Sequence, residues 1–147
     1  MSASVSILLE RKGSAVHSLP PSASVLDAVQ LMNKSQVSSV LIVNNGQLAG
    51  IFTERDVLRR VVGSGLDPKT TLLSNVMTAG LTSITRATSI EEAHAIFNSR
   101  HCRHLPVLDG DRIAGLISVG DISRWLSDMN RAEAESLKSY ISGGLST

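Results

Sequence analysis

The most constraining feature of this chain is a seven-residue segment that occurs twice. Residues 50–56 return as residues 115–121, 65 positions later. Each copy places a glycine, an apolar strand end, a hydroxyl residue and an aspartate where a helix is expected to begin. The same offset extends in both directions without a gap, and it pairs Ser24 with Ser89. The chain is therefore expected to contain two copies of one supersecondary unit.

Each copy predicts the element order β-α-β-β-α. Ser24 and Ser89 are good N-cap residues, and Glu92 occupies the capping-box position in the second copy. Asn-Gly and Asp-Gly between apolar runs predict two hairpins. Thr53 and Ser118 are then expected to cap the closing helices. The predicted extended segments are 15–19, 40–43 and 48–52 in the first copy and 80–84, 105–108 and 113–117 in the second.

The apolar strands predict an α/β (α+β) fold in which the two units pack through their sheets with pseudo-two-fold symmetry. Continuous apolar character indicates burial on both strand faces. A unit of roughly 50 residues buries too little surface to be secure alone, so the units are expected to share one core. The expected boundaries are 8–66 for the first repeat, 72–130 for the second, and 131–147 for a C-terminal tail. That tail predicts a short amphipathic helix over 131–140, with fraying at Gly143 and Gly144.

Composition narrows the choice of function. The net charge is +1, so no strong electrostatic field favours binding to nucleic acid or to an acidic membrane. Aromatic residues make up only 3% of the chain, which is too few to bind single-stranded nucleic acid by stacking on its bases. No stretch approaches the roughly 20 apolar residues that span a bilayer, and residues 1–11 lack the features of a secretory signal. Cys102 is the only cysteine. A cytoplasmic protein that binds neither nucleic acid nor membrane is expected.

The repeated motif can carry chemistry because a helix N-terminus presents unpaired amides that bind anions. A hydroxyl residue at the cap can contact phosphate, and the aspartate can accept from two ribose hydroxyls. The alternative is that Thr53 and Ser118 only cap, while Asp56 and Asp121 only favour the helix dipole. Spacing alone leaves these two interpretations open.

The two units resemble a tandem pair of cystathionine-β-synthase-type (CBS) domains, a Bateman module, and in particular small stand-alone bacterial proteins of this type. The segments that carry the resemblance are 50–56, 115–121 and 103–110. The resemblance implies adenosyl ligands, AMP first and ATP or NAD(H) as alternatives, in clefts between the repeats. By position, the first cleft would combine Ile51, Thr53 and Asp56 with Thr82, Cys102, Arg103 and His104. The second would combine Leu116, Ser118 and Asp121 with His17, Val37 and Ser38.

The two clefts are not equivalent in sequence. Arg103 and His104 correspond to Ser38 and Ser39, and Arg55 corresponds to a glycine in the second copy. Arg55, Arg103 and His104 could converge on phosphate. No such cations are expected near the second cleft. We therefore expect the cleft of Thr53 and Asp56 to bind a phosphorylated adenosine ligand more tightly.

Other motifs give weaker signals. His94, His101, Cys102 and His104 do not match a zinc-ligand spacing, so no metal is expected. Gly63-Ser64-Gly65 lacks the third glycine of a dinucleotide fingerprint and reads as a linker, and no P-loop is present. No nucleophile–base pair is placed by the sequence, so catalysis is the least supported function.

The sequence favours a non-catalytic regulatory sensor that signals to an unknown protein when an adenosyl nucleotide binds. The alternative is a ligand-independent dimerisation or scaffold module. The resemblance also implies a homodimer. The apolar helix positions available to its interface are Val57, Leu58, Val61, Ile122, Trp125 and Leu126.

Overall fold

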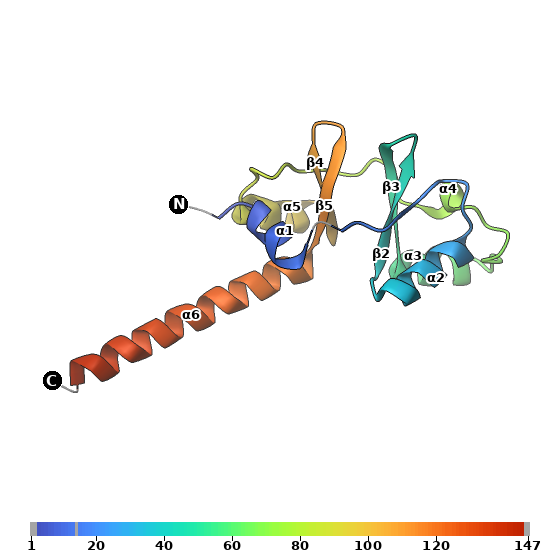
Figure 1. Cartoon of the computed structure of the whole chain (residues 1–147). Coiled ribbons are helices and arrows are strands. Elements are labelled where there is room, and N and C mark those ends of the chain that lie inside the picture. Colours follow the sequence, from blue (N-terminus) through green and yellow to red (C-terminus); the bar gives the residue numbers. More distant parts are fainter. Residues whose placement is uncertain (1–2, 14, 146–147) are drawn as a thin grey trace.

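The computed structural model describes residues 3–13 and 15–145, which form two units side by side and a long helix that projects from one of them (Figure 1). The elements are α1 (Ser6–Lys12), β1 (Ser18–Leu19), α2 (Val25–Ser35), β2 (Ser39–Asn44), β3 (Gln47–Thr53), α3 (Glu54–Asp56), the π-helix η1 (Val57–Val62), α4 (Leu73–Val76), α5 (Ile90–Arg100), β4 (His104–Asp109), β5 (Arg112–Ser118) and α6 (Val119–Leu145). The mixed helix and strand content with two small sheets confirms the predicted α+β class.

The two sheets repeat one plan with one difference. β2–β3 and β4–β5 are antiparallel hairpins with a register shift at corresponding points, between Ile42 and Val43 and between Val107 and Leu108. β1 pairs with β2 in parallel. The predicted strand at 80–84 is wrong: within the described residues it is reduced to one bridge, Ile84 to Val107.

Proline explains the missing strand. In the first repeat the Leu41 amide donates to the His17 carbonyl at 2.9 Å. The same offset that relates the two repeats places Pro106 at the position of Leu41 and Thr82 at that of His17. Because proline has no amide hydrogen, the equivalent bond to Thr82 cannot form.

The hairpin turns form as the sequence predicts. Asn45 and Gly46 both have positive φ, 52° and 79°, which is the geometry that tight hairpins of this kind require. In the second hairpin Gly110 has φ 61°. The predicted N-caps also form, but the reciprocal capping box lies in the first repeat: Ser24 and Asp27 exchange both bonds at 3.1 Å.

The helix of the C-terminal tail differs from expectation. α6 is one continuous helix of 27 residues that starts after Ser118 and includes the 131–140 segment as well as Gly143 and Gly144. No proline interrupts residues 119–145, so nothing in the chain forces a separate tail helix. Its C-terminal half projects away from both units (Figure 1).

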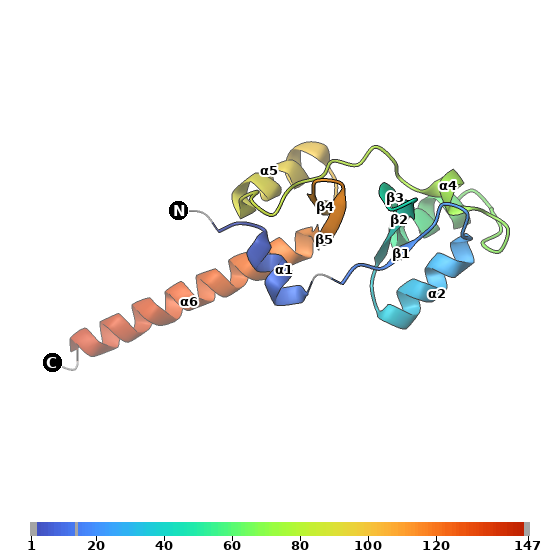
Figure 2. The same ribbon diagram turned by 45° about the horizontal axis from the view of Figure 1, so that its top comes forward.

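The buried side chains form two clusters, so the expectation of one shared core is wrong. One cluster gathers the first repeat with Leu73 and Val76 of α4. The other gathers the second repeat with Val5, Leu8 and Leu9, which precede the first repeat in the chain. In Figure 2, α1 lies beside β5 and the start of α6, and α4 lies beside the first repeat. Each repeat therefore completes its core with the short helix that precedes the other repeat.

Candidate functional site

A cavity of about 540 Å³ opens between the two units, at the starts of α3, β4 and α6. Both repeats contribute to it. Its lining residues are Ser38, Ile51, Thr53, Glu54, Arg55 and Asp56 from the first repeat, Thr78 and Leu81 from the connection that follows α4, and Arg100, His101, Cys102, Arg103, His104, Ser118, Val119 and Gly120 from the second repeat. A cavity of this volume matches small-molecule sites in other proteins.

Thr53 and Asp56 form a capping box at the wall of this cavity. The Thr53 amide donates to Asp56 Oδ2 at 3.0 Å, and the Asp56 amide donates to Thr53 Oγ1 at 3.3 Å. The other carboxylate oxygen of Asp56 lies 3.6 Å from Arg60 Nε, beyond hydrogen-bond distance. Asp56 is buried and belongs to the cavity lining.

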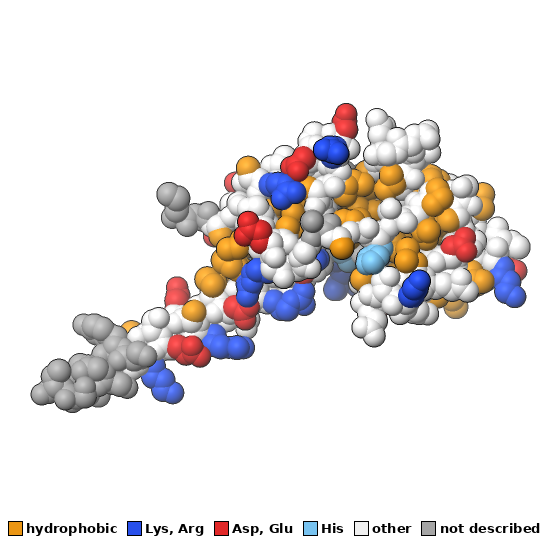
Figure 3. Space-filling model, viewed as in Figure 1, with side chains coloured by type: hydrophobic (Ala, Val, Ile, Leu, Met, Phe, Trp, Pro, Cys, Tyr) orange, Lys and Arg blue, Asp and Glu red, His pale blue; other side chains and the backbone are white. Residues whose placement is uncertain are grey.

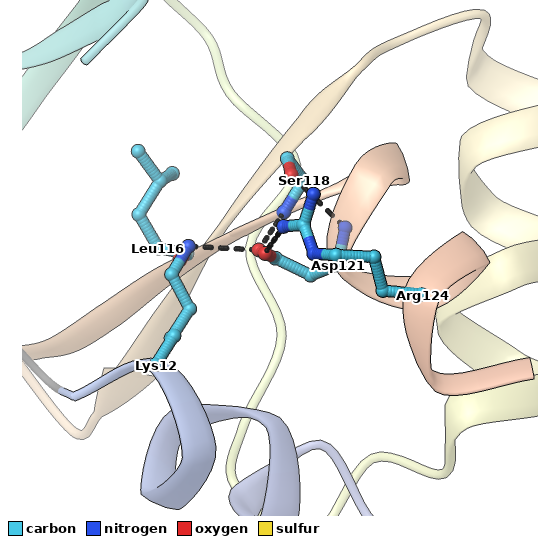
Figure 4. Close-up of polar contacts among 5 residues, drawn as sticks. All are labelled: Lys12, Leu116, Ser118, Asp121 and Arg124. Carbon is cyan, nitrogen blue, oxygen red and sulfur yellow. Dashed lines mark hydrogen bonds and ion pairs between the residues drawn. The ribbon is translucent and has the colours of Figure 1, made fainter. Parts of the chain in front are cut away.

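Ser118 and Asp121 form the same box in the second repeat, but Asp121 has further partners (Figure 4). Lys12 Nζ donates to Asp121 Oδ2 at 2.7 Å and to the Leu116 carbonyl at 2.8 Å. Arg124 Nη2 donates to Asp121 Oδ1 at 2.6 Å. The expectation that no cations lie near this copy is therefore wrong.

These contacts set the charge of Asp121. Burial alone would raise the pKa of the Asp121 carboxyl, but hydrogen bonds from Lys12 and Ser118 outweigh burial and hold the pKa below its ordinary value. The carboxylate is therefore ionised at neutral pH and is fully engaged within the protein.

Cationic side chains gather on the cavity wall. Arg55, Arg100 and Arg103 line it. The acidic residues in the lining are Glu54 and Asp56. Figure 3 shows further Lys and Arg side chains near the point where α6 leaves the two units. Arginine forks bind phosphate oxygens well, so this wall suits an anionic group.

His104 and Cys102 are tuned by their surroundings. Burial, and then the charge of Lys12, lowers the pKa of His104, while Asp121 opposes this, so the ring is neutral at pH 7. Burial raises the pKa of the Cys102 thiol, which therefore stays protonated and a weak nucleophile at that pH. Among the described residues, no group of three His, Cys, Asp or Glu side chains could hold a metal ion.

The structure brings together nine of the residues singled out from the sequence. They are Ile51, Thr53, Arg55, Asp56, Cys102, Arg103 and His104, together with Ser38 and Ser118, which the sequence assigned to the other cleft. The residues outside the cavity lining are His17, Val37, Thr82, Leu116 and Asp121. Ser38 and Ser118 thus line the same cavity as Asp56, although the sequence assigned them to the second cleft.

Several lining residues were not singled out as ligands. His101 belongs to the histidine and cysteine motif for which no metal is expected, and Arg100 directly precedes it. Thr78 and Leu81 come from the connection after α4. His101 has φ 53° and Gln36, at the corresponding position, has φ 55°. Both end their helices in this left-handed conformation. That shared helix end places the segment after α5 at the cavity.

Comparisons with known proteins identify the class. The CBS domain family model matches the chain twice, over residues 13–63 and 73–128. These matches cover more than half of the chain, so it belongs to the CBS-domain family and carries a tandem pair of such domains. Proteins built on these domains are generally regulatory modules.

Individual relatives show how far the similarity extends. CBS domain-containing protein CBSX3, a mitochondrial protein of Arabidopsis thaliana, is 34% identical over 126 residues, which cover 82% of this chain but only 61% of CBSX3. YhcV of Bacillus subtilis (strain 168) is 29% identical over 127 residues, with 86% and 89% covered. The solved structure of a protein with CBS domains from Burkholderia ambifaria MC40-6 is 33% identical, with TM-score 0.80 and coverage of 84% and 93%.

Proposed function

We propose that this protein is a non-catalytic sensor that binds an adenosyl nucleotide in the cavity between its CBS domains and signals to a partner protein. The observation that carries the proposal is the wall of that cavity, which is lined by Asp56 together with three arginines. CBS domains commonly bind adenosyl ligands, which supports the choice of ligand class. AMP is our first choice, with ATP and NAD(H) as alternatives.

The chemistry of the wall fits the two polar parts of such a ligand. A carboxylate accepts hydrogen bonds from two vicinal ribose hydroxyls, and Asp56 lines the cavity with one oxygen beyond hydrogen-bond distance of Arg60. Arg55, Arg100 and Arg103 provide charge-assisted donors for phosphate. A protonated thiol and a neutral imidazole give no activated nucleophile, which favours binding over catalysis.

Signalling follows from where the ligand would sit. A ligand in this cavity contacts both repeats at once, so it favours whichever arrangement of the repeats fits it better. A difference in affinity worth about 1–3 kcal/mol is enough to couple the site to a partner. We propose in addition that the signal is passed to a partner protein and that the protein acts in the cytoplasm.

Among the described residues, we find no helix with the length and apolar character needed to span a membrane.

A homodimer is the second part of the proposal. Of the apolar helix positions expected at its interface, Val61 and Ile122 are buried within the chain and are unavailable. Leu58 is 65% exposed and Leu126 is 42% exposed. Val62, which the sequence did not single out, is also 65% exposed. We therefore assign the interface to Leu58, Val62 and Leu126.

Thermal shift and calorimetry test the ligand. AMP, ATP and NADH should each be titrated, because a ligand that binds only the native state raises the melting temperature. Arg103→Gln should weaken AMP binding by about tenfold, since it removes one charge-assisted contact. Arg59→Gln is the matched control, because Arg59 lies outside the cavity lining. No shift at millimolar nucleotide would contradict the sensor and support the scaffold alternative.

A further inference from the structure

The two repeats differ in the segment that packs against the glycine of the repeated motif. Met77 Sδ lies 2.9 Å from the position that a Cβ on Gly50 would take, and Leu9 Cδ2 lies 2.6 Å from the same position on Gly115. The segments that follow α4 and end α1 are therefore structural counterparts. Their continuations beyond this point are different.

After α4 the chain leaves the helix and pairs with β3. The Thr78 amide donates to the Ile51 carbonyl at 2.9 Å. After Leu9 the chain stays helical as far as Lys12. Lys12 Nζ then donates to the carbonyl of Leu116, which is the counterpart of Ile51. A lysine ammonium therefore replaces the backbone amide that serves this carbonyl in the first repeat.

The same ammonium reaches the motif aspartate. Lys12 Nζ lies 2.7 Å from Asp121 Oδ2, and the Asp121 side chain is only 6% exposed (Figure 4). In the first repeat the nearest cation to Asp56 is Arg60, at 3.6 Å and on the same helical segment. Asp56 lines the cavity, whereas Asp121 lies outside its lining.

The lysine is held there by a docked helix. Leu8 and Leu9 of α1 are 3% and 2% exposed and belong to the core of the second repeat. Arg11 Nη2 lies 2.6 Å from Asp128 Oδ2, and the Arg11 guanidinium lies 5.4 Å from the centre of the Trp125 ring. Both contacts fix the C-terminal end of α1 to α6, next to Lys12.

We propose that the Lys12 ammonium occupies the ligand position of the second copy of the repeated motif. By binding the Asp121 carboxylate, Lys12 keeps ligands away from it until the end of α1 moves away. The proposal rests on the proposed function, because it assumes that the motif carboxylate is the group that a ribose would contact. It makes the protein a one-site sensor with a second site that α1 can expose. Arg124 also pairs with Asp121, but its side chain is 72% exposed and can swing into solvent.

Calorimetry with AMP tests the closed site in the full chain. Wild type is expected to bind a single AMP per chain, and Lys12→Met is expected to bind a second. Asp121→Ala in the Lys12→Met background should abolish that second event and leave the first. Lys69→Met is the control, since Lys69 is exposed and lies in the connection between the repeats. Two AMP molecules on wild type, or only one on a folded Lys12→Met variant, would overturn the proposal.

A ligand-free measurement separates this proposal from the proposed function. Acetylation of each lysine can be followed by mass spectrometry, and an ammonium held by two acceptors should react about tenfold more slowly than an exposed one. We expect Lys12 to lag behind Lys34 and Lys69 in wild type and to react several-fold faster in Asp121→Asn. Equal rates for all three in wild type would show that Lys12 is free. If no nucleotide binds wild type, the proposed function fails, and the acetylation rates alone decide whether Lys12 holds Asp121.

Discussion

Leu9 Cδ2 lies 2.6 Å from the place where a Cβ on Gly115 would be, so this glycine is required by the packing of α1. A Cβ on Gly50 would likewise lie 2.7 Å from the Thr78 carbonyl oxygen, and it would also be close to the Met77 side chain. The glycine that opens each copy of the repeated motif therefore serves close approach by a neighbouring segment rather than a turn.

Gly115→Ala and Gly50→Ala should both destabilise the fold, by about 1–3 kcal/mol as overpacking does. Gly50→Ala should cost more, because its new methyl group meets a backbone oxygen that cannot rotate away, whereas Leu9 is a flexible side chain. Urea unfolding measures both free energies. Gly120→Ala is the control, since its nearest atom is Arg124 Nη1 at 3.4 Å.

A double-mutant cycle identifies the contact. Leu9→Ala alone should cost about 2–4 kcal/mol because it leaves a cavity in the core of the second repeat. Adding Gly115→Ala to Leu9→Ala should cost much less than it does in wild type. Strict additivity would show that α1 does not pack against Gly115 in solution.

Stability should fall as the pH drops through the titration of His104. The pKa of His104 is lowered by burial and by Lys12, so the unfolded chain takes up a proton at a higher pH than the folded chain does. The stabilisation is therefore complete above about pH 6.5 and is lost as the pH falls below it. The melting temperature should decrease as the pH is lowered from 7.5 to 5.5. In the His104→Gln variant the melting temperature should decrease less over the same pH range.

The matched variant for this measurement is His94→Gln, which removes an exposed histidine of α5. Its melting temperature should depend on pH as that of wild type does. A His104→Gln curve parallel to wild type would contradict the role assigned to burial of this ring.

Dimerisation should depend on the exposed apolar positions of η1 and α6. Leu58→Lys and Leu126→Lys place a charge in the proposed interface, so each should weaken the dimer by roughly tenfold or more. Light scattering after gel filtration, over a range of protein concentrations, measures this. Leu66→Lys is the control, because Leu66 is 41% exposed but lies in the connection between the repeats. A wild-type chain that remains monomeric at high concentration would exclude the proposed dimer.

Local signals in the sequence predicted most of the fold. Asn45 and Gly46 fix one hairpin through their own backbone preferences, and Ser24 and Ser89 cap their helices through neighbouring amides. The lost strand at 80–84 was also readable, because Pro106 removes a backbone donor. These features depend on residues close in sequence, or on a chemical property of a single residue.

The arrangement around Asp121 could not be predicted in this way. Lys12 and Asp121 are 109 residues apart, and they meet only because Leu8 and Leu9 dock α1 on the repeat that is distant in sequence. The cavity lining has the same origin, since Ser38 and Ser118 come from opposite repeats. Pairwise matching by the repeat offset assigned Ser38 and Ser118 to the second cleft and could not show that they would line the same cavity as Asp56.

We propose that Asp56 holds an adenosyl nucleotide in the cavity between the repeats. Calorimetry of AMP with wild type, Asp56→Ala and Asp121→Ala tests it directly, at a temperature where all three are folded. We predict that AMP binds wild type saturably. Asp56→Ala should lower the affinity by about tenfold or more, because a hydrogen bond to a charged group is removed. Asp121→Ala should change the affinity little. Unchanged affinity in Asp56→Ala, or a larger loss in Asp121→Ala, would contradict the claim.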